Sequence, residues 1–325
     1  MNGPQIVLCS IADEELSSVI RDYGFELYRD FTEVPAEKVE NIRIILGGGG
    51  GEKTNLKRLS NLSFVQLSSA GTNGYDDSSL YANPGVTLAT ASGVYGDPIA
   101  EYVIGGMLCM GKRSLANYLS SRGFLFNRSL AVDSQMDIEL SKASVGIWGC
   151  GDIGKKIARK LRALDCRYVY GVSRSGRNPE DIFTESYKLE NCEEFLPYCD
   201  FIVSAMPENP DSVHYWNVKR FEQMKKGCIF FNVGRGSAVV FKDLQYALNH
   251  RRISGAVIDV SEPEPVPLWH PHRFTRRLLL TNHSSFYSNY NRDRLIALFI
   301  SQFQKHVLGQ EVENKVILSK KYRRS

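Results

Sequence analysis

Four polar side chains follow apolar, strand-like runs in the second half of the chain: Arg235, Asp259, Glu264 and His283. An imidazole can transfer a proton near neutral pH, and a guanidinium can stabilise negative charge that develops on an oxygen. A carboxylate beside the histidine favours its protonated form. Because parallel α/β sheets bind ligands at the carboxyl ends of their strands, we expect these side chains to converge there. Taken singly, each is also compatible with an ordinary surface loop.

Upstream of these residues, a glycine-rich segment separates a strand-like run from a helix-like run. Gly149, Gly151 and Gly154 follow the pattern G-x-G-x-x-G. In a dinucleotide-binding turn, the first glycine permits the tight turn, the second admits the pyrophosphate and the third lets the helix pack on the strand. The helix start, with Asp152 and Ile153, would hold the phosphates through free N–H groups and the helix dipole. The segment therefore predicts a dinucleotide site.

The strand after the glycine-rich segment indicates which nicotinamide cofactor binds. An NAD site has an acidic residue about twenty positions on, where it holds the ribose 2′-hydroxyl. Here that strand is followed by Ser173, Arg174 and Ser175, without a carboxylate. Arg174 can make a charge-assisted contact with a 2′-phosphate. We therefore predict NADP(H) in preference to NAD(H), the alternative being that Arg174 is a solvated loop residue.

Parallel strands must position these residues. The first hundred residues alternate helix-like and strand-like runs, with a helix at 13–23 and strands at 5–9, 41–46, 64–68 and 86–89. A long helix is predicted from Asp97 to about residue 112, with Pro98 in its first turn. From the glycine-rich segment onward, a second alternating series begins. Its expected strands are 145–148, 167–172, 201–204, 228–232, 255–258 and 278–281, before a final helix at about 291–308.

These two series predict an α/β fold with two doubly wound parallel-sheet domains. The second domain is inserted between the first domain and its terminal helix. Residues 1–97 and 286–325 would form the first domain and residues 98–285 the second, in which 98–143 contain the long helix and a polar arm. The cleft between the domains is the expected ligand site.

Three motifs resemble the signatures of the D-isomer specific 2-hydroxyacid dehydrogenase family. They are Asn-Val-Gly-Arg-Gly at 232–236, Asp-Val-x-Glu-Pro-Glu-Pro at 259–265, and the late strand-end histidine His283. Their order and spacing match the family, and the resemblance covers nearly the whole chain. It implies that a flavodoxin-like domain binds the substrate and that an inserted Rossmann domain binds the dinucleotide.

The resemblance also assigns roles to residues. Arg235 would bind the substrate carboxylate and keto oxygen, His283 would donate the proton, and Glu264 would hydrogen-bond to His283. Asp259 and the Val233 carbonyl would lie at the nicotinamide carboxamide. Contacts along the adenosine half would come from Met206, Pro207 and Ser212.

The first domain would supply the other substrate contacts. The loop after the strand at 64–68 resembles the substrate loop of the family, in which the backbone N–H groups of Ala70 and Gly71 would bind the carboxylate. The same loop is compatible with a plain tight turn. The glycine run at 47–51 suits either a rim of the cleft or a surface loop.

Together these residues predict NADPH-dependent reduction of a small 2-keto acid, of the glyoxylate or hydroxypyruvate type, to the D-2-hydroxy acid. Two alternatives stay open. One is a non-catalytic NAD(P) sensor that binds protein partners, as the corepressors with this fold do. The other is a dehydrogenase that works in the oxidation direction, such as a phosphoglycerate or formate dehydrogenase. The resemblance further implies a homodimer formed through the helix and arm at about 97–140.

The chain departs from the family pattern near the catalytic histidine. Asn282 stands where the family usually has proline, and Ser284 and Ser285 replace a small apolar or glycine pair. Val240 stands where an acidic residue commonly follows the arginine loop. The serine pair makes this wall of the site more polar, and none of the changes removes a reacting group.

Composition excludes several other classes of protein. With 325 residues and a net charge of +4, the chain suits two domains and does not predict nucleic-acid binding. Seven scattered cysteines indicate a reducing compartment, and the longest apolar run is too short to span a bilayer, so we expect a cytoplasmic protein with no membrane partner. His270 and His272 lack a carboxylate partner, so we expect no metal site.

Overall fold

The computed structural model describes residues 4–48, 50–112 and 137–319. The chain divides into two compact units, Met1–Tyr95 with Ser288–Ser325 (unit 1) and Gly96–Tyr287 (unit 2). The predicted domain boundaries, after residue 97 and before residue 286, lie close to these limits. Residues 113–136, which include much of the predicted arm within 98–143, and residues 320–325 lie outside the described residues. No helix in the described ranges is long and apolar enough to cross a membrane.

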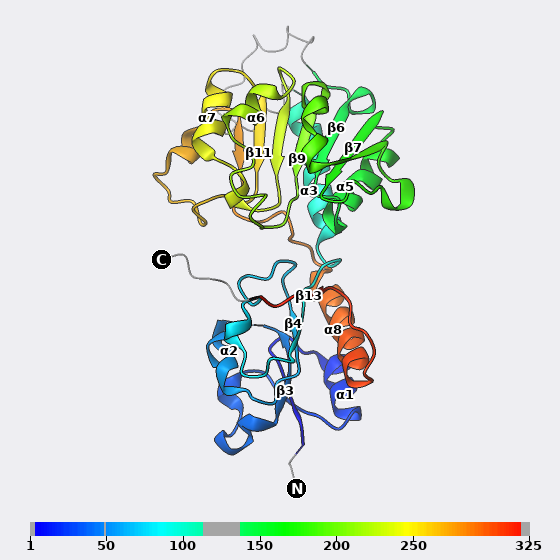
Figure 1. Ribbon diagram of the computed structural model, residues 1–325, viewed down its shortest axis with the longest axis vertical. Coiled ribbons are helices and arrows are strands. Elements are labelled where there is room, and N and C mark those ends of the chain that lie inside the picture. Colours follow the sequence, from blue (N-terminus) through cyan, green and yellow to red (C-terminus); the bar gives the residue numbers. More distant parts are fainter. Residues whose placement is uncertain (1–3, 49, 113–136, 320–325) are drawn as a thin grey trace. The chain divides into compact units, whose positions relative to one another are not determined.

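Unit 1 contains a six-stranded sheet with the strand order β13-β5-β4-β3-β1-β2 (Figure 1). Neighbouring strands are parallel, except that β13 runs antiparallel to β5. The strands are β1 (Ile6–Cys9), β2 (Glu26–Tyr28), β3 (Ile42–Gly47), β4 (Phe64–Leu67), β5 (Thr87–Ala89) and β13 (Lys315–Val316). The helices are α1 (Glu14–Asp22), α2 (Gly50–Asn55) and α8 (Asn291–Val307).

Both faces of this sheet are buried under apolar side chains. Along β1, Ile6 and Leu8 belong to one apolar cluster and Val7 and Cys9 to another, because successive strand residues point to opposite faces. Side chains of α1 and α8 complete the second cluster, and Figure 1 shows these two helices together beside the sheet, opposite α2. Asp13 begins α1 as its N-cap, with a carboxylate oxygen 2.9 Å from the backbone nitrogen of Leu16.

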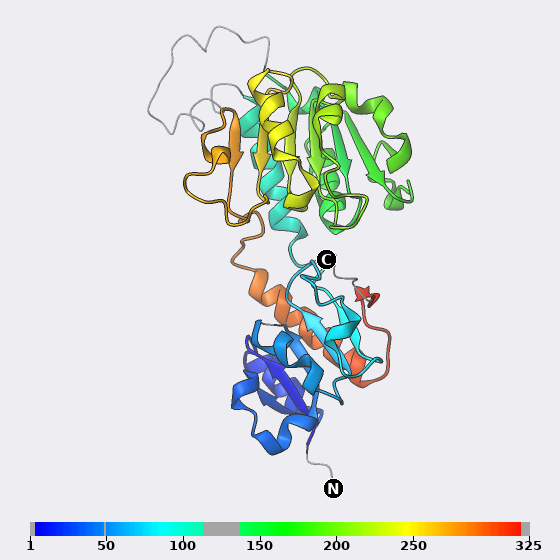
Figure 2. The same ribbon diagram turned by 60° about the vertical axis from the view of Figure 1, so that its left-hand side comes forward.

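Unit 2 contains a seven-stranded, all-parallel sheet with the order β12-β11-β10-β9-β6-β7-β8. Figure 2 shows its strands side by side, from the orange β12 at one edge to the green β8 at the other. The strands are β6 (Ser144–Trp148), β7 (Tyr168–Ser173), β8 (Glu185–Lys188), β9 (Phe201–Ser204), β10 (Ile229–Asn232), β11 (Gly255–Ile258) and β12 (Leu278–Leu280). The helices are α3 (Gly96–Gly111), α5 (Asp152–Ala163), α6 (Val218–Gln223) and α7 (Phe241–Asn249).

The strand order of unit 2 reverses at β6, which lies between β7 and β9. In doubly wound sheets, ligands bind at such a switch point, beyond the carboxyl ends of the strands. The glycine-rich segment directly follows β6 and therefore lies at this point.

Helices cover both faces of the larger sheet. Phe230 packs beside Trp216 in a cluster that also contains side chains of α6 and α7. The next residue, Phe231, points to the opposite face and lies against α3 at Gly106. On α3, Asp97 forms an ion pair with Lys156 of α5 at 2.7 Å.

The structure confirms the predicted fold class of two parallel-sheet α/β domains, and the ten predicted strands are present. It adds β2, β8 and β13, which the sequence analysis did not identify. These strands have two to four residues, lie at sheet edges and are only partly buried. They lack the apolar runs of the central strands because one side of each faces solvent.

Candidate functional site

The glycine-rich turn after β6 leaves space at one glycine and none at the other two. Gly149 has φ +106°, and a Cβ there would lie 2.5 Å from the carbonyl oxygen of Ala205. A Cβ on Gly154 would lie 2.0 Å from the carbonyl oxygen of Gly149. Gly151 faces open space, with no atom within 4 Å of a Cβ position. Thus two glycines close the turn, and the third leaves an approach to its backbone.

The N-terminus of α5 lies at this approach. Gly151 is the N-cap residue, so no side chain caps the first N–H groups of the helix. Asp152, in the first turn, directs its carboxylate toward Gly96 at the start of α3. The backbone at Asp152, Ile153 and Gly154 can therefore serve an anion, as the sequence predicts for a pyrophosphate.

The loop after β7 has hydroxyl groups and a guanidinium. Ser173 accepts a hydrogen bond from the Gly176 N–H at 3.1 Å, and Ser175 lies 3.4 Å from Ser173 between their oxygens. Arg174 is exposed, and in the described ranges no carboxylate pairs with it. Burial raises the pKa of the Cys150 thiol, next to this loop, to about 12.

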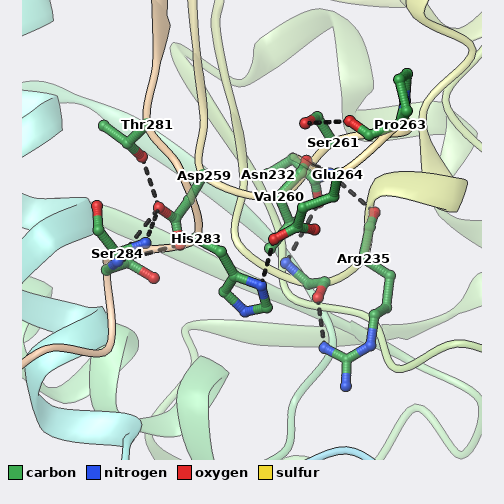
Figure 3. Close-up of polar contacts among 12 residues, drawn as sticks. Asn232, Arg235, Asp259, Val260, Ser261, Pro263, Glu264, Thr281, His283 and Ser284 are labelled. Carbon is green, nitrogen blue, oxygen red and sulfur yellow. Dashed lines mark hydrogen bonds and ion pairs between the residues drawn. The ribbon is translucent and has the colours of Figure 1, made fainter. Parts of the chain in front are cut away.

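The Arg235 loop is built around a buried asparagine. The Asn232 amide, fully buried at the end of β10, donates to the carbonyl oxygens of Arg235 at 2.9 Å and Val260 at 3.2 Å. It thereby ties the loop after β10 to the loop after β11 (Figure 3). A Cβ on Gly236 would lie 2.3 Å from the Ser261 backbone, which explains the second glycine of the motif. Arg235 itself is half-buried.

The residue Met206 links this loop to the dinucleotide turn. A Cβ on Gly234 would lie 2.6 Å from its carbonyl oxygen, and a Cβ on Gly149 would lie 3.0 Å from its nitrogen. The loops after β6, β9 and β10 therefore meet at Met206. Pro207 follows it directly, and Val233 donates its N–H to the Ser204 carbonyl at 2.9 Å.

Glu264 and His283 form a direct pair. Nδ1 of His283 lies 2.6 Å from Oε1 of Glu264, and both side chains are partly exposed, at 47% and 37% (Figure 3). The carboxylate thus fixes the ring through Nδ1 and leaves Nε2 for another partner. His283 has φ +49°, which non-glycine residues rarely adopt, and its N–H donates to the Asp259 carbonyl at 2.8 Å.

Asp259 is 1% exposed at the end of β11. Its carboxylate accepts hydrogen bonds from the Thr281 hydroxyl at 2.5 Å and from the N–H groups of Ser284 and Ser285 at 2.8 and 3.2 Å. Tyr102 of α3 lies 2.8 Å from Thr281 between their hydroxyl oxygens. Burial raises the pKa of Tyr102 to about 12. The predicted contact of Asp259 with a nicotinamide carboxamide stays a prediction.

A pocket of about 240 Å³ lies between the loops after β11 and β12. Its lining combines carboxylates and polar groups with two apolar residues: Asp259, Ser261, Glu264, Pro265, Val266, Thr281 and Asn282. Asn282, which stands where the family usually has proline, therefore adds an exposed amide to this pocket.

Other predicted site residues lie elsewhere. The Ser212 hydroxyl is buried and hydrogen-bonded to Asn209. It accepts the Asn209 N–H at 2.9 Å and donates to the Asn209 carbonyl at 3.0 Å, so it closes a local turn.

Ala70 and Gly71 belong to unit 1, in the loop after β4. In the described ranges no acceptor is recorded for their N–H groups, while the Ser69 hydroxyl donates to the Gly71 carbonyl at 2.7 Å. Their substrate role stays a prediction.

The sequence analysis did not identify Asn232, Thr281 or Tyr102. Asn232 carried a signal, because a polar residue that ends an otherwise apolar run needs a buried partner. Thr281 and Tyr102 lie 179 positions apart in the chain, and no local pattern joins them.

The family model for the NAD binding domain of D-isomer specific 2-hydroxyacid dehydrogenases matches residues 119–285. Human glyoxylate reductase/hydroxypyruvate reductase is 29% identical over 182 residues, which cover 55% of this chain and 54% of that enzyme. Glyoxylate reductase from Thermococcus kodakarensis is 31% identical over 196 residues, or 57% of this chain and 58% of that enzyme. The chain thus spans little more than half the length of these curated relatives. A D-isomer specific 2-hydroxyacid dehydrogenase family protein from Aeromonas salmonicida has a solved structure that is 27% identical, with a TM-score of 0.79 over 97% of this chain and 99% of that one.

Proposed function

The chain belongs to the D-isomer specific 2-hydroxyacid dehydrogenase family, and we propose that it uses NADPH to reduce a small 2-keto acid to the D-2-hydroxy acid. The family consists of NAD(P)-dependent oxidoreductases that act on small 2-hydroxy or 2-keto acids. The substrate we propose is of the glyoxylate or hydroxypyruvate type. The observation that carries the proposal is the pair between Glu264 and His283, whose Oε1 and Nδ1 atoms lie 2.6 Å apart. The pair lies at the same edge of the unit 2 sheet as the dinucleotide turn, where the parallel strands have their carboxyl ends.

The residues at these strand ends suit the proton and charge changes of the reduction. When bound, NADPH supplies the hydride that is added to C2 of the keto acid. Arg235 holds the carboxylate and keto oxygen and stabilises the negative charge that grows on that oxygen. His283 gives its Nε2 proton to the oxygen as a general acid, and Glu264 keeps the ring oriented through Nδ1. The added hydride and this proton together make the hydroxyl-bearing product.

The two units divide the binding tasks. We assign the dinucleotide to unit 2, which has the open Gly151 turn and the α5 N-terminus without a side-chain cap. We assign part of the substrate carboxylate to the N–H groups of Ala70 and Gly71 in unit 1.

The loop after β7 favours NADP(H) over NAD(H). Arg174 is exposed and pairs with no carboxylate in the described ranges, so it is available to a 2′-phosphate, and Ser173 and Ser175 supply hydroxyl donors. We expect Arg174→Ala to raise the KM for NADPH about tenfold or more and to change the KM for NADH little. A wild-type enzyme with a higher kcat/KM for NADH would contradict this preference.

The catalytic roles are tested by separating binding from turnover. We expect His283→Ala and Arg235→Ala each to lose at least about a hundredfold in kcat/KM for the keto acid. NADPH should still bind both variants, as measured by quenching of tryptophan fluorescence. Wild-type turnover in His283→Ala would remove the histidine from its proposed role.

A homodimer and a cytoplasmic location complete the proposal. Leu108 on α3 is 47% exposed, which suits an apolar contact with a second copy. None of the seven cysteines, all within the described ranges, forms a disulfide, which suits a reducing compartment. Light scattering coupled to gel filtration would measure the mass, and a monomer at micromolar concentration would contradict the dimer.

A further inference from the structure

The turn that contains His283 is held by one residue. The Asp259 carbonyl accepts the His283 N–H, and the Asp259 carboxylate accepts the N–H groups of Ser284 and Ser285. Three consecutive backbone N–H groups therefore converge on Asp259 (Figure 3). This arrangement stabilises the left-handed conformation of His283, which an L-residue would otherwise tend to leave.

The Asp259 carboxylate is itself fixed by hydrogen bonds rather than by a cation. In the described ranges, no lysine or arginine forms an ion pair with it, although it is 1% exposed. A buried charge without a counter-ion must be balanced by well-oriented donors. Besides the two backbone groups, the donor that supplies this orientation is the Thr281 hydroxyl, 2.5 Å from Oδ1.

The hydrogen bonds of Thr281 connect Asp259 to Tyr102 on α3. A carboxylate oxygen accepts hydrogen bonds, so the Thr281 hydroxyl donates its single proton to Asp259 Oδ1. Its oxygen then accepts from the Tyr102 hydroxyl at 2.8 Å. Tyr102 keeps its proton at working pH because burial holds its pKa near 12. The chain of donors therefore runs from Tyr102 to Thr281 to Asp259.

We propose that Tyr102 and Thr281 are positioning residues, which act through Asp259 to hold the turn of His283 in the geometry needed for proton transfer. The two hydroxyl groups reach the His283 turn through Asp259, because Tyr102 is hydrogen-bonded to Thr281 and Thr281 to Asp259. The proposal rests on the proposed function for its catalytic consequence, but the positioning itself is a property of the chain alone. Within the part of the chain that the structure describes, Asp259 Oδ2 accepts the Ser285 N–H at 3.2 Å and has capacity for a further partner.

The test compares variants that keep or remove the hydroxyl groups. Thr281→Val removes the donor with little change in shape, Thr281→Ser keeps it, and Tyr102→Phe removes the first hydroxyl of the chain. Thr275→Val is the matched control, because Thr275 is a buried threonine of the same unit whose hydroxyl donates instead to the Pro271 carbonyl at 3.1 Å. We expect Thr281→Val to lower kcat about tenfold or more, with KM and NADPH affinity changed less than about threefold. Thr281→Ser and Thr275→Val should stay within about threefold of wild type, and Tyr102→Phe should fall between.

A second readout does not depend on activity. The six histidines can be labelled with ¹³C, and the His283 signal can be assigned by its loss in His283→Gln. We expect Thr281→Val and Tyr102→Phe to shift the His283 signal and to leave the other histidine signals in place. Should Thr281→Val fail to fold, Tyr102→Phe, which keeps the aromatic ring, tests the positioning role by itself.

The outcomes separate the two proposals. An unchanged His283 signal in these variants, or equal losses of kcat in Thr281→Ser and Thr281→Val, would overturn the positioning role. A displaced signal together with a wild-type protein that reduces no 2-keto acid would support the positioning role and contradict the proposed function.

Discussion

At the scale of single residues, the hydrogen bonds that His283 and Arg235 already form decide which of their nitrogen atoms are left for a ligand. Glu264 lies against Nδ1 of His283, so Nε2 is the ring nitrogen left for the substrate oxygen in the proposed reaction. Arg235 donates to the Gly234 carbonyl at 2.7 Å through Nη1, which leaves its other donors for an anion. Both side chains are therefore oriented by a hydrogen bond and keep donors for the substrate that we propose.

We predict that Glu264→Gln lowers kcat by about 10- to 100-fold, because a neutral amide stabilises the imidazolium less than a carboxylate does. Steady-state kinetics with the keto acid measures the loss. Glu262→Gln is the matched control, since Glu262 is an exposed carboxylate nearby with no ion pair in the described ranges. Equal turnover in the Glu264 variant and the Glu262 variant would show that the pair does not support proton transfer.

At the scale of elements, the glycines of the dinucleotide turn have different roles: Gly154 permits close packing, and Gly151 leaves space for a ligand. We predict that Gly154→Ala lowers the melting temperature by about 5 °C or more, because its methyl group would overlap the Gly149 carbonyl, 2.0 Å away. Gly151→Ala should melt within about 2 °C of wild type, since its methyl group meets no atom within 4 Å. It should nevertheless bind NADPH at least about tenfold more weakly, because the methyl group stands where the pyrophosphate approaches.

Calorimetric titration with NADPH and thermal unfolding without it measure the two effects. If Gly151→Ala bound NADPH as tightly as wild type, the open side of this turn would not be the pyrophosphate site.

The loop between Glu264 and β12 contains a histidine whose lowered pKa makes the free energy of unfolding depend on pH. His272 is buried against Phe241, and burial, followed by the nearby His270, lowers the pKa of His272 to about 4. The pKa of histidine in an unfolded chain is about 6.5. At pH values between about 6.5 and about 4, His272 is therefore protonated in the unfolded chain but neutral in the folded protein. Stability contributed by the neutral ring is thus present above this window and is lost as pH falls through it.

We predict that the wild-type protein loses about 2 kcal/mol more unfolding free energy between pH 7 and pH 5 than His272→Leu does. Urea unfolding at the two pH values measures the difference. His250→Leu, at an exposed histidine of the same unit, should lose as much as wild type. An equal loss in His272→Leu and wild type would show that His272 does not titrate in this window.

The elements that hold the site were largely predictable from sequence. The strands β10, β11 and β12 are apolar runs of three or four residues. The residues that follow them, Arg235, Glu264 and His283, were predicted to lie together by the rule for strand ends. The edge strands β2, β8 and β13 were missed because they are short and carry polar residues. The Tyr102–Thr281 contact was also missed, because it joins a helix and a strand end that only the tertiary fold brings together.

At the scale of the whole molecule, unit 2 interrupts unit 1 in the sequence. Unit 1 contains the Ala70–Gly71 loop, and unit 2 contains the other residues of the proposed site. The insertion explains why the glycine-rich segment begins near residue 149 rather than near the N-terminus.

The central claim is most directly tested by following NADPH oxidation by the wild-type protein with glyoxylate, hydroxypyruvate, pyruvate and bulkier 2-keto acids. We predict saturable oxidation with at least one of the small acids, a D-configured product where the product is chiral, and loss of this activity in His283→Ala. Absence of oxidation with every acid, from a folded protein that binds NADPH, would contradict it.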